Sequence, residues 1–443
     1  MSGLDRPLDI AVIGTGIAGM AAAWLLNRRH RVTVFEAADR LGGHSNTVEA
    51  PGAAGPVPVD TGFIVYNETN YPNLVALFRL LGVETQPTEM SFGVSLDDGA
   101  LEYGGSDLRA LFAQPANLTR ARFWTMLRDI RRFYRDAAVD RDLLGESLEN
   151  LGDYLDRNRY SRAFQEDHLL PMAAAIWSAP IGTIRDYPAA GFIRFCDNHG
   201  LLKLTGRPLW RTIIGGSRAY VAKLTAPYAH RLQLGRGIRA LRRTPAGIVL
   251  SDTGGAAGLY DHVVIATHAD QALDLLADPS DDEEALLGAF RYERNLAVLH
   301  RDPALMPKRR AVWSSWNYLA QRGPGLESGL SVTYWMNRLQ GLDAADPLFV
   351  TLNPLRPPQP GSIVRSEAYE HPIFDAAALR AQRLLWSLQG RQNTWFCGAY
   401  FGAGFHEDGL QAGLAVAEAL GGVRRPWQVP AESGRIHLAE AVA

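Results

Sequence analysis

The first part of the chain alternates short apolar runs with glycine turns. Residues 9–13 and 31–35 are short apolar or β-branched runs, and an alanine-rich run lies between them. Short apolar runs bounded by turn residues predict buried strands, whereas a longer alanine-rich run predicts a helix. We therefore expect a strand, a glycine turn, a helix and a second strand over residues 9–37.

Three later segments show related patterns. Residues 213–224 place a glycine pair before a helical run, and residues 261–273 read as a buried strand followed by a turn and a helix. Residues 397–413 crowd five glycines into a segment that then turns helical. Glycine loses more backbone entropy on folding than any other residue, so this cluster predicts positive φ or a very close approach to another group.

Composition narrows the class of protein. The chain has 443 residues, is 47% hydrophobic and 21% charged, and has a formal net charge of -2, which predicts a globular protein of two interleaved lobes. The near-neutral charge gives no sign of nucleic-acid binding. Cys196 and Cys397 are too few for a disulfide framework, and the first apolar run is too short for a membrane span or signal peptide. We expect a cytoplasmic protein without a metal site.

One arginine-rich stretch has helical periodicity. Residues 120–135, with Arg120 and Arg135 at their ends, carry arginines at helical spacing beside a mainly apolar stripe of Phe123, Trp124, Leu127, Ile130 and Tyr134. A solvated face over a packed face is one interpretation. The alternative is a surface helix that contacts anionic lipid headgroups, which would place the protein peripherally at the inner membrane face.

The glycines after the first strand form a dinucleotide-binding pattern. Gly14, Gly16 and Gly19 make G-x-G-x-x-G between a strand and a helix, and Glu36 ends the second strand about 20 residues further on. Backbone N–H groups and the positive helix end would bind a pyrophosphate, and the carboxylate would accept hydrogen bonds from both ribose hydroxyls.

Residues beyond Glu36 resemble the FAD-dependent amine oxidase and phytoene desaturase superfamily. That family follows its first βαβ unit with R-x-G-G-R, and here Arg40, Gly42 and Gly43 match while His44 stands at the last position. The run VDTGFIVYN, residues 59–67, resembles the family's D-x-G segment, which passes close to the flavin ring.

The resemblance implies an α/β fold with a Rossmann-type parallel sheet built from discontinuous segments. Residues 1–70, 213–290 and 390–430 would form the FAD-binding domain, with Ile238 at the adenine side. Residues 71–212 and 291–389, which are rich in tryptophan and tyrosine, would form an interleaved mixed α+β substrate lobe, and 431–443 a C-terminal tail.

The glycine-rich C-terminal segment resembles the family block that runs under the flavin. The helix beginning near Glu407 would point N–H groups at the flavin N1 and C2 carbonyl, where charge accumulates on reduction. Where the family has Gly-Asp, this chain has Gly398 followed by Ala399. Phe405 matches one position of the aromatic pair that amine oxidases present to the flavin.

Together these motifs give one set of expected FAD contacts. The set is Gly14, Gly16, Ile17, Ala18, Gly19, Glu36, Ala37, Arg40, Gly42, Gly43, His44, Thr61, Gly62, Phe63, Ile238, Gly398, Phe405, Gly409 and Leu410.

The substrate class follows from the resemblance and from an apolar stretch. The combined motifs look most like bacterial predicted NAD/FAD-binding proteins associated with cyclopropane-type fatty acid synthases, a branch that includes a desaturase of methylated unsaturated acyl chains in furan fatty acid synthesis. Residues 171–202 are strongly apolar and would suit lobe core or a tunnel for a hydrocarbon. We expect hydride transfer from an unsaturated fatty acyl or phospholipid substrate to flavin N5. The sequence does not specify the electron acceptor.

Candidates for the base or proton relay are His406, Glu407, Asp408, Tyr66 and Tyr400. His406 is the first choice because an ordinary histidine titrates near neutral pH. Its alternative role is a hydrogen bond that fixes the glycine loop. Glu407 and Asp408 also suit the start of a helix, where the dipole favours acids.

Three other functions stay open. A fatty acid double-bond isomerase needs the same pocket as a desaturase. An amine oxidase is disfavoured because Lys203, Lys223 and Lys308 match no water-holding lysine of that family. A flavin-binding protein without turnover is the remaining alternative, and the missing acid at Ala399 favours it.

Overall fold

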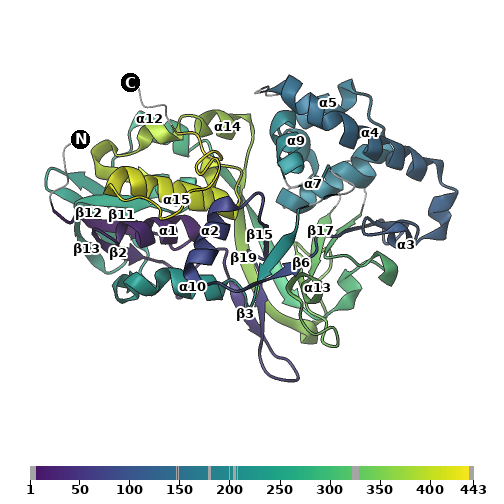
Figure 1. Ribbon diagram of the computed structural model, residues 1–443, viewed down its shortest axis with the longest axis horizontal. Coiled ribbons are helices and arrows are strands. Elements are labelled where there is room, and N and C mark those ends of the chain that lie inside the picture. Colours follow the sequence, from purple (N-terminus) through teal and green to yellow (C-terminus); the bar gives the residue numbers. More distant parts are fainter. Residues whose placement is uncertain are drawn as a thin grey trace.

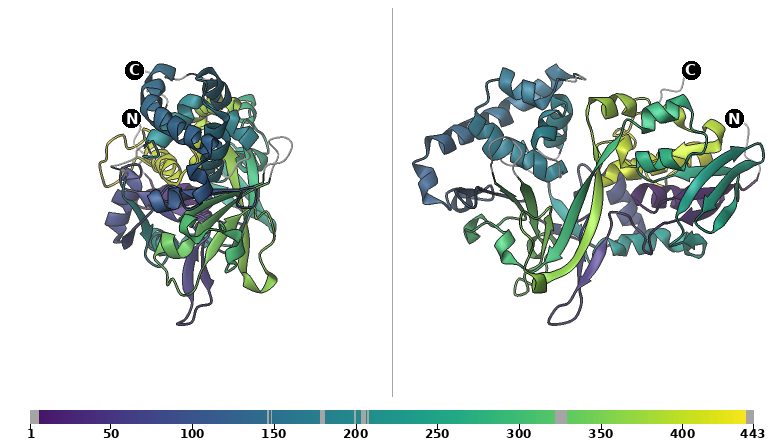
Figure 2. Two further views of the ribbon diagram at one scale, coloured as in Figure 1. Left: turned by 90° about the vertical axis from the view of Figure 1, so that its right-hand side faces the viewer. Right: turned by 180° about the vertical axis from the view of Figure 1, so that it is seen from behind.

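The computed structural model describes residues 6–145, 147, 149–177, 181–198, 200–202, 206, 208–321 and 329–438 (Figure 1). The N-terminal and C-terminal segments, purple and yellow, lie side by side in one lobe, which we call the nucleotide lobe. A second lobe combines a large sheet with a layer of helices. The long strands β15 (Arg291–His300) and β19 (Ile363–Ile373) run between the two, as Figure 2 also shows.

The nucleotide lobe is built on a parallel sheet. Its strands are β10 (Leu232–Gln233), β2 (Arg31–Phe35), β1 (Asp9–Ile13), β14 (His262–Ile265) and β20 (Thr394–Phe396), in that order. All adjacent pairs within it are parallel. Since these strands come from three distant parts of the chain, the expected α/β fold assembled from discontinuous segments is confirmed. The exact segment boundaries stay a prediction.

Two helices cover this sheet. α1 (Ile17–Leu26) follows the first glycine turn, and α15 (His406–Gly421) follows the C-terminal glycines, close to the expected start near Glu407. The remaining elements of this lobe are α10 (Arg218–Thr225), η3 (Ala226–Arg231), β11 (Ile238–Thr244), β12 (Gly247–Asp252), β13 (Gly255–Tyr260), α11 (Ala269–Leu275), α12 (Asp281–Leu287), α14 (Ala376–Gln382), η7 (Leu385–Leu388), η8 (Arg391–Asn393) and η9 (Ala399–Phe401).

The second lobe contains a mixed sheet. Its order is β19, β15, β18 (Phe349–Leu352), β17 (Leu330–Trp335), β16 (Trp316–Ala320), β7 (Phe92–Leu96) and β8 (Leu101–Gly104). Only β16 and β7 pair in parallel among these described strands. Smaller elements beside it are η4 (Pro303–Leu305), η5 (Arg310–Val312), α13 (Met336–Gln340) and η6 (Pro360–Ser362).

A helical layer lies over one side of this sheet (Figure 1). It comprises α3 (Leu108–Leu111), η1 (Pro115–Leu118), α4 (Ala121–Leu144), α5 (Leu151–Arg157), α6 (Arg162–Phe164), η2 (Gln165–Leu169), α7 (Leu170–Trp177), α8 (Ile181–Arg185) and α9 (Ala189–Asn198). Connecting elements are β3 (Thr47–Ala50), β4 (Val57–Asp60), β5 (Val65–Asn67), α2 (Pro72–Leu81), β6 (Thr85–Thr88) and β9 (Trp210–Ile213).

Helix α4 follows the expected apolar stripe except at Trp124. Phe123 is buried, and Leu127, Ile130 and Tyr134 pack against the core, whereas Trp124 is 49% exposed. Met126 and Phe133, which the stripe did not include, are buried as well. Arg128, Arg132 and Arg135 pair with the helix's own Asp129 and Asp136, which lowers the net positive charge of this face.

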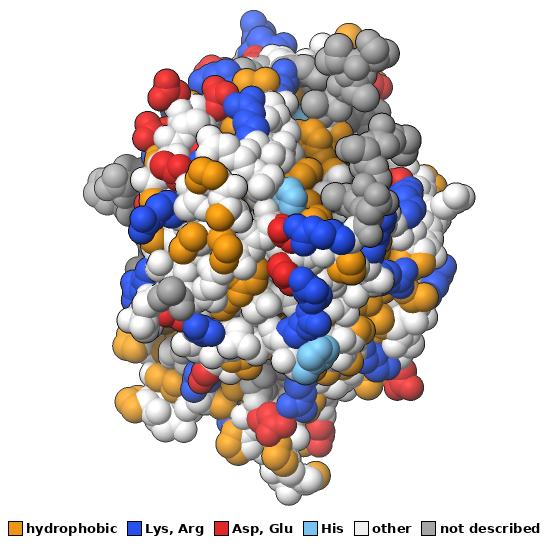
Figure 3. Space-filling view, turned by 90° about the vertical axis from the view of Figure 1, so that its left-hand side faces the viewer, with side chains coloured by type: hydrophobic (Ala, Val, Ile, Leu, Met, Phe, Trp, Pro, Cys, Tyr) orange, Lys and Arg blue, Asp and Glu red, His pale blue; other side chains and the backbone are white. Residues whose placement is uncertain are grey.

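Among the described residues, no helix is both long enough and apolar enough to cross a membrane. On the outer end of the nucleotide lobe, basic and acidic side chains are interspersed (Figure 3).

The glycines of α15 allow two helix backbones to touch. A Cβ at Gly413 would lie 2.1 Å from the carbonyl oxygen of Ala18, and one at Gly409 would lie 2.9 Å from Cγ2 of Ile17. Side chains of any size at these positions would push α15 away from α1. Part of the C-terminal glycine cluster therefore serves helix packing and not the approach to a ligand.

The contact predicts a large cost for the smallest substitution. Gly413→Ala should lower the free energy of unfolding by roughly 2–4 kcal/mol, because the backbone of α1 cannot move aside without straining the sheet. Chemical denaturation measures this. The matched control is Gly191→Ala in α9, where an added Cβ meets nothing within 4 Å and stability should rise by about 0.5–1 kcal/mol. Equal effects at both sites would contradict the close contact.

Candidate functional site

A cavity of about 800 Å³ runs between the two lobes. At one end it meets the carboxyl ends of β1, β2 and β14, and at the other it reaches the mixed sheet and the helices α7 and α9. In open α/β sheets, ligands bind outside the carboxyl ends of the strands. This cavity is therefore the candidate site.

The N-terminus of α1 opens into the cavity. Gly14 has φ +100°, and a Cβ there would lie 2.8 Å from the carbonyl oxygen of Ala266. Gly16, which precedes α1, has nothing within 4 Å of an added Cβ, so space lies directly in front of the helix. Free N–H groups and the positive end of the helix dipole make this point a phosphate site.

Glu36 lies at the end of β2 with its carboxylate at the cavity wall. One oxygen accepts a hydrogen bond from the backbone N–H of Thr15 (2.9 Å), and the other accepts one from that of Ala38 (2.9 Å). These donors fix the carboxylate where it can accept from ribose hydroxyls. Ala37 and Ile238 continue the wall beyond it, as expected for the adenine side.

Most of the expected FAD contacts line this cavity. They are Gly14, Gly16, Ile17, Ala18, Glu36, Ala37, Gly42, Gly43, His44, Thr61, Gly62, Phe63, Ile238, Gly398 and Phe405. Their contacts with the cofactor stay a prediction.

Four expected contacts do not line it. Gly19 allows α1 to pack on Gly14, whose carbonyl oxygen would lie 2.0 Å from an added Cβ. The guanidinium of Arg40 donates to the carbonyl of Gly43 (2.8 Å). Gly409 and Leu410 are buried in α15, where Gly409 packs against α1. These positions support the site from behind.

The D-x-G segment is tied to the glycine pair of residues 213–224. Buried Asp60 accepts hydrogen bonds from the N–H of Ser217 (2.9 Å) and from Nε2 of Gln340 (3.1 Å). Burial raises its pKa to about 6 against these hydrogen bonds. Asp60 therefore holds Thr61 and Gly62 at the cavity wall from the rear.

Three buried polar atoms of the wall have neither a hydrogen-bond partner nor an ion-pair partner among the described residues. They are Nε2 of His44, the hydroxyl of Tyr400 and the indole nitrogen of Trp316. Unpaired buried polar atoms are costly, so each indicates a ligand with hydrogen-bonding groups. An extended dinucleotide, with phosphates at α1 and a ribose at Glu36, fits these atoms and the shape of the lining.

His406 is held rigidly at the cavity wall. Its ring stacks on Phe63 with centroids 3.8 Å apart, and its Nε2 lies 2.7 Å from the hydroxyl oxygen of Tyr220 and 3.2 Å from that of Ser45. Burial lowers the pKa of His406 to about 3. The imidazole is thus neutral throughout the physiological range and poorly suited to keep a proton, contrary to the expectation that it titrates near neutrality.

Three other catalytic candidates point away from the cavity. Glu407 accepts hydrogen bonds from the N–H groups of Asn73 and Leu74 (3.0 Å each) and so caps α2. Asp408 caps α15 through the N–H of Phe405 (2.7 Å) and pairs with Arg435 (2.7 Å). Tyr66 packs against Tyr71 and Phe78. We assign these three residues structural roles, which leaves His406 and Tyr400 at the wall.

The far end of the cavity is apolar. Its lining includes Phe92, Met172, Ile176, Leu201, Trp316, Leu352 and Phe374. Phe405 stacks on Phe195 with centroids 4.8 Å apart. Within residues 171–202, some side chains such as Phe192 are core and others line the cavity, whereas a tunnel for a hydrocarbon stays a prediction. The side chain of Trp177 lies outside the described residues.

The described lining contains no lysine. Lys223 donates to the carbonyl of Gly82, and Lys308 pairs with Asp98 (2.6 Å). Lys203 lies outside the described residues. No described lysine is therefore available to hold a water at the centre of this site.

Several wall residues carried no signal in the sequence. His371 and Tyr369 of β19 line the cavity, and Tyr220 of α10 and Ser45 of the loop after Gly43 contact the wall residue His406. They meet only after strands and helices far apart in the chain have packed, and their spacing forms no motif.

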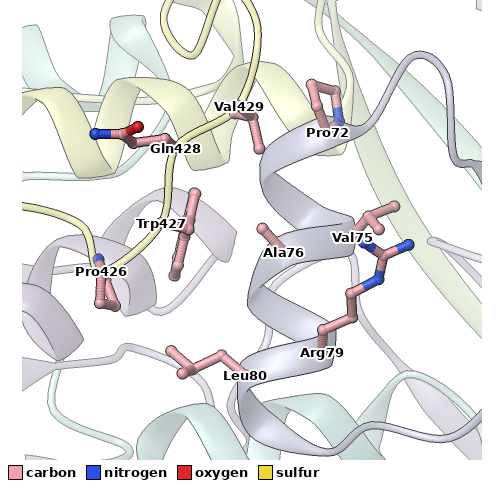
Figure 4. Close-up of a pocket in the computed structure, with 9 residues that line it drawn as sticks. All are labelled: Pro72, Val75, Ala76, Arg79, Leu80, Pro426, Trp427, Gln428 and Val429. Atoms are coloured by element: carbon pink, nitrogen blue, oxygen red, sulfur yellow. The ribbon is translucent and has the colours of Figure 1, made fainter.

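A second, shallow pocket of about 370 Å³ lies between α2 and residues 426–429 (Figure 4). Its lining is Pro72, Val75, Ala76, Arg79, Leu80, Pro426, Trp427, Gln428 and Val429. Arg79 is its single titratable side chain among these described residues, so it lacks the groups that chemistry would need.

Comparison with known proteins agrees with this site. The model of the family "Flavin containing amine oxidoreductase" matches residues 17–421. The chain belongs to this family, and FAD is the cofactor that membership implies. When bound, FAD supplies an acceptor for a hydride.

Individual curated relatives share limited sequence identity with this chain. A protein of Mycobacterium tuberculosis (strain H37Rv), provisionally named flavin-containing monoamine oxidase AofH, is 29% identical over 257 residues, 56% of this chain and 55% of the relative. The chain thus matches about half the length of such curated relatives.

Solved structures share the fold. The fatty acid isomerase of P. acnes that produces CLA superimposes with a TM-score of 0.66 at 16% identity, over 94% of this chain and 99% of the other. Cyclohexylamine oxidase from Brevibacterium oxydans IH-35A gives 0.64 at 17% identity, over 94% and 100%.

The role assigned to Glu407 can be tested by substitution. Glu407→Ala should lower the free energy of unfolding by roughly 2–4 kcal/mol, because it leaves buried N–H groups of α2 unpaired. The FAD content of the purified protein should stay that of wild type. Glu284→Ala, at an exposed glutamate of α12, should change stability by no more than about 0.5 kcal/mol. A stable variant with impaired turnover would restore Glu407 as a catalytic candidate.

Proposed function

We propose that this protein is an FAD-dependent oxidoreductase that removes hydrogen from an unsaturated fatty acyl chain, most specifically by desaturating a methylated chain. The supporting observation is the set of apolar side chains that α7, α9 and the mixed sheet contribute to the lining of the cavity. Desaturation would transfer a hydride to FAD and a proton from the neighbouring carbon to a base or relay, for which His406 and Tyr400 are the candidates at the wall, and would leave a double bond. A long hydrocarbon is bound mainly by the area of apolar surface it buries.

The residues at the junction of the two ends would orient the chain. The stacked pair Phe195 and Phe405 and the aromatic side chain of Trp316 offer flat apolar surfaces to a double bond. His406, fixed by Phe63 and Tyr220, would act as a neutral hydrogen-bonding group. Closure of the site by apolar side chains would exclude water from the reacting bond.

Amine oxidation is the activity that the names of several relatives suggest. A protonated amine needs a carboxylate or a similar acceptor in its pocket. The carboxylates of the described lining are Glu36 at the end of β2, Asp274 in α11 and Glu370, which pairs with His268. We therefore favour an acyl chain over an amine.

Isomerisation is the second candidate. It uses the same pocket, and differs in that the hydride returns to another carbon of the chain. The similarity of fold to a fatty acid isomerase supports a lipid substrate without distinguishing these two outcomes. A flavin-binding protein without turnover stays the third alternative, because Ala399 lacks the family's acid.

The acyl chain would come from a phospholipid or a free fatty acid. Contact with a membrane surface through α4 is part of this proposal, since Arg128, Arg131 and Arg135 are exposed beside a half-exposed Trp124. Such a face suits the interface of an anionic bilayer. Sedimentation with vesicles that contain phosphatidylglycerol, compared with phosphatidylcholine alone, measures this contact.

The substrate is tested by the anaerobic visible spectrum. Phospholipids with methyl-branched unsaturated chains should bleach the oxidised flavin, and amines should not, because only the former fill the apolar end. Product analysis separates desaturation from isomerisation. Bleaching by amines alone would contradict the proposal, and no bleaching by either compound, with unchanged lipid, would favour a protein without turnover.

A cavity-filling substitution tests whether the acyl chain of the substrate enters through the apolar end of the cavity. Met172→Trp on α7 should slow acyl-dependent bleaching by at least about tenfold, roughly 1.4 kcal/mol of barrier, by blocking the apolar end. Flavin content should not change. Leu108→Trp, at a position 73% exposed on α3, is the matched control and should have no effect. If the Met172→Trp variant bleached as fast as wild type, the acyl chain would have to enter the site by another route.

A further inference from the structure

Three histidines meet in the cavity wall from separate elements. His44 follows Gly43, His268 precedes α11 and His371 lies in β19, and all three line the cavity. The ring of His44 lies 5.3 Å from that of His371 and 6.4 Å from that of His268, measured between centroids. We call these residues the histidine cluster.

The cluster adjoins the N-terminus of α1. A Cβ on Gly43 would lie 3.2 Å from Cα of Gly16, the residue that precedes the helix. The backbone of His44 therefore lies close to the free N–H groups at the N-terminus of α1. Its buried Nε2 has no partner among the described residues, so it is available to a ligand at that point.

Permanent positive charge is scarce in this part of the wall. The arginines of the described lining are Arg236 and Arg239, which flank Ile238 at the adenine side. The guanidinium of Arg40 is turned to the carbonyl of Gly43 and does not line the cavity. A helix N-terminus offers only about half an elementary charge, which does not neutralise a diphosphate.

The histidines are neutral without a ligand. Burial, and then repulsion from His371 and His268, lowers the pKa of His44 well below its ordinary value. Burial likewise lowers the pKa of His371 to about 4. Burial also lowers the pKa of His268, although the nearby carboxylates of Asp270 and Glu370 raise it in part. Arg40 and His406 also face the cluster and oppose its protonation. A bound anion would raise the pKa values of these histidines, because it stabilises their protonated imidazolium forms.

We propose that the histidine cluster is a protonatable diphosphate site, so that FAD binding is coupled to the uptake of protons. The direction of the pH dependence follows from the linkage between proton binding and FAD binding. A group whose pKa is higher in the complex than in the free protein strengthens binding as pH falls through the pKa of the complex. FAD affinity should therefore weaken as pH rises from 6 to 8.

The first test uses the wild-type apoprotein and two ligands. Calorimetric titration with FAD in buffers of different ionisation enthalpy should show net uptake of about one proton, and the Kd should rise at least about fivefold between pH 6 and 8. Riboflavin, which lacks the phosphates, should bind with little pH dependence. No proton uptake with FAD, or the same pH dependence for both ligands, would overturn the proposal.

The second test locates the protons. His44→Gln and His371→Gln keep a hydrogen-bonding side chain that does not titrate, and each should flatten the pH dependence of the FAD Kd, the double variant most. His230→Gln, at an exposed histidine of η3, is the matched control and should keep the wild-type slope. A full slope in the double variant would place the titrating group outside the cluster. Since no substrate is present, this result stands apart from that of the proposed reaction.

Discussion

The direct contact between the backbones of α1 and α15 is the constraint on which the site depends. Gly413 lets the later helix lie against the carbonyl of Ala18, so the two helices cover the parallel sheet in one fixed register. Both helices then begin at the cavity, α1 behind Gly16 and α15 at His406. Buried ionic contacts of the C-terminal segment, Arg425 with Glu418 and Arg435 with Asp408, hold α15 from its other side.

The cavity joins two walls of different chemistry. The nucleotide lobe supplies backbone N–H groups and the carboxylate of Glu36, whereas the mixed sheet and α7 supply apolar side chains. A ligand with a phosphate-bearing part and a hydrocarbon-facing part matches this division. The strand β19 links the walls, because Tyr369 bonds the hydroxyl of Thr61 in the nucleotide lobe (2.6 Å).

Local sequence patterns predicted the parts of the structure that depend on neighbours in the chain. The first βαβ unit, the glycine turn before α1 and the acid at Glu36 all follow from spacing over about 30 residues. The G-G-H segment and Phe405 line the same cavity.

Local sequence patterns did not predict the role of a side chain where that role depends on tertiary packing. Glu407 lies in the first turn of α15, as its position in the sequence suggested, but its carboxylate accepts hydrogen bonds from α2, which is distant in sequence. Trp124 fitted the apolar stripe of its helix, yet it is half exposed, whereas Met126 and Phe133 outside the stripe are buried. His371 has no neighbouring signal at all, because only the pairing of β19 with β15 brings it to the cavity.

The order of the strands has a consequence for how the protein is made. The edge strand β20 and helix α15 come from residues 394–421, although they complete a sheet that begins at Asp9. On the ribosome, the N-terminal βαβ unit therefore emerges long before the wall at Gly398 and His406 exists. The cofactor pocket therefore lacks one wall until residues 394–421 have been translated and have packed onto the earlier βαβ unit.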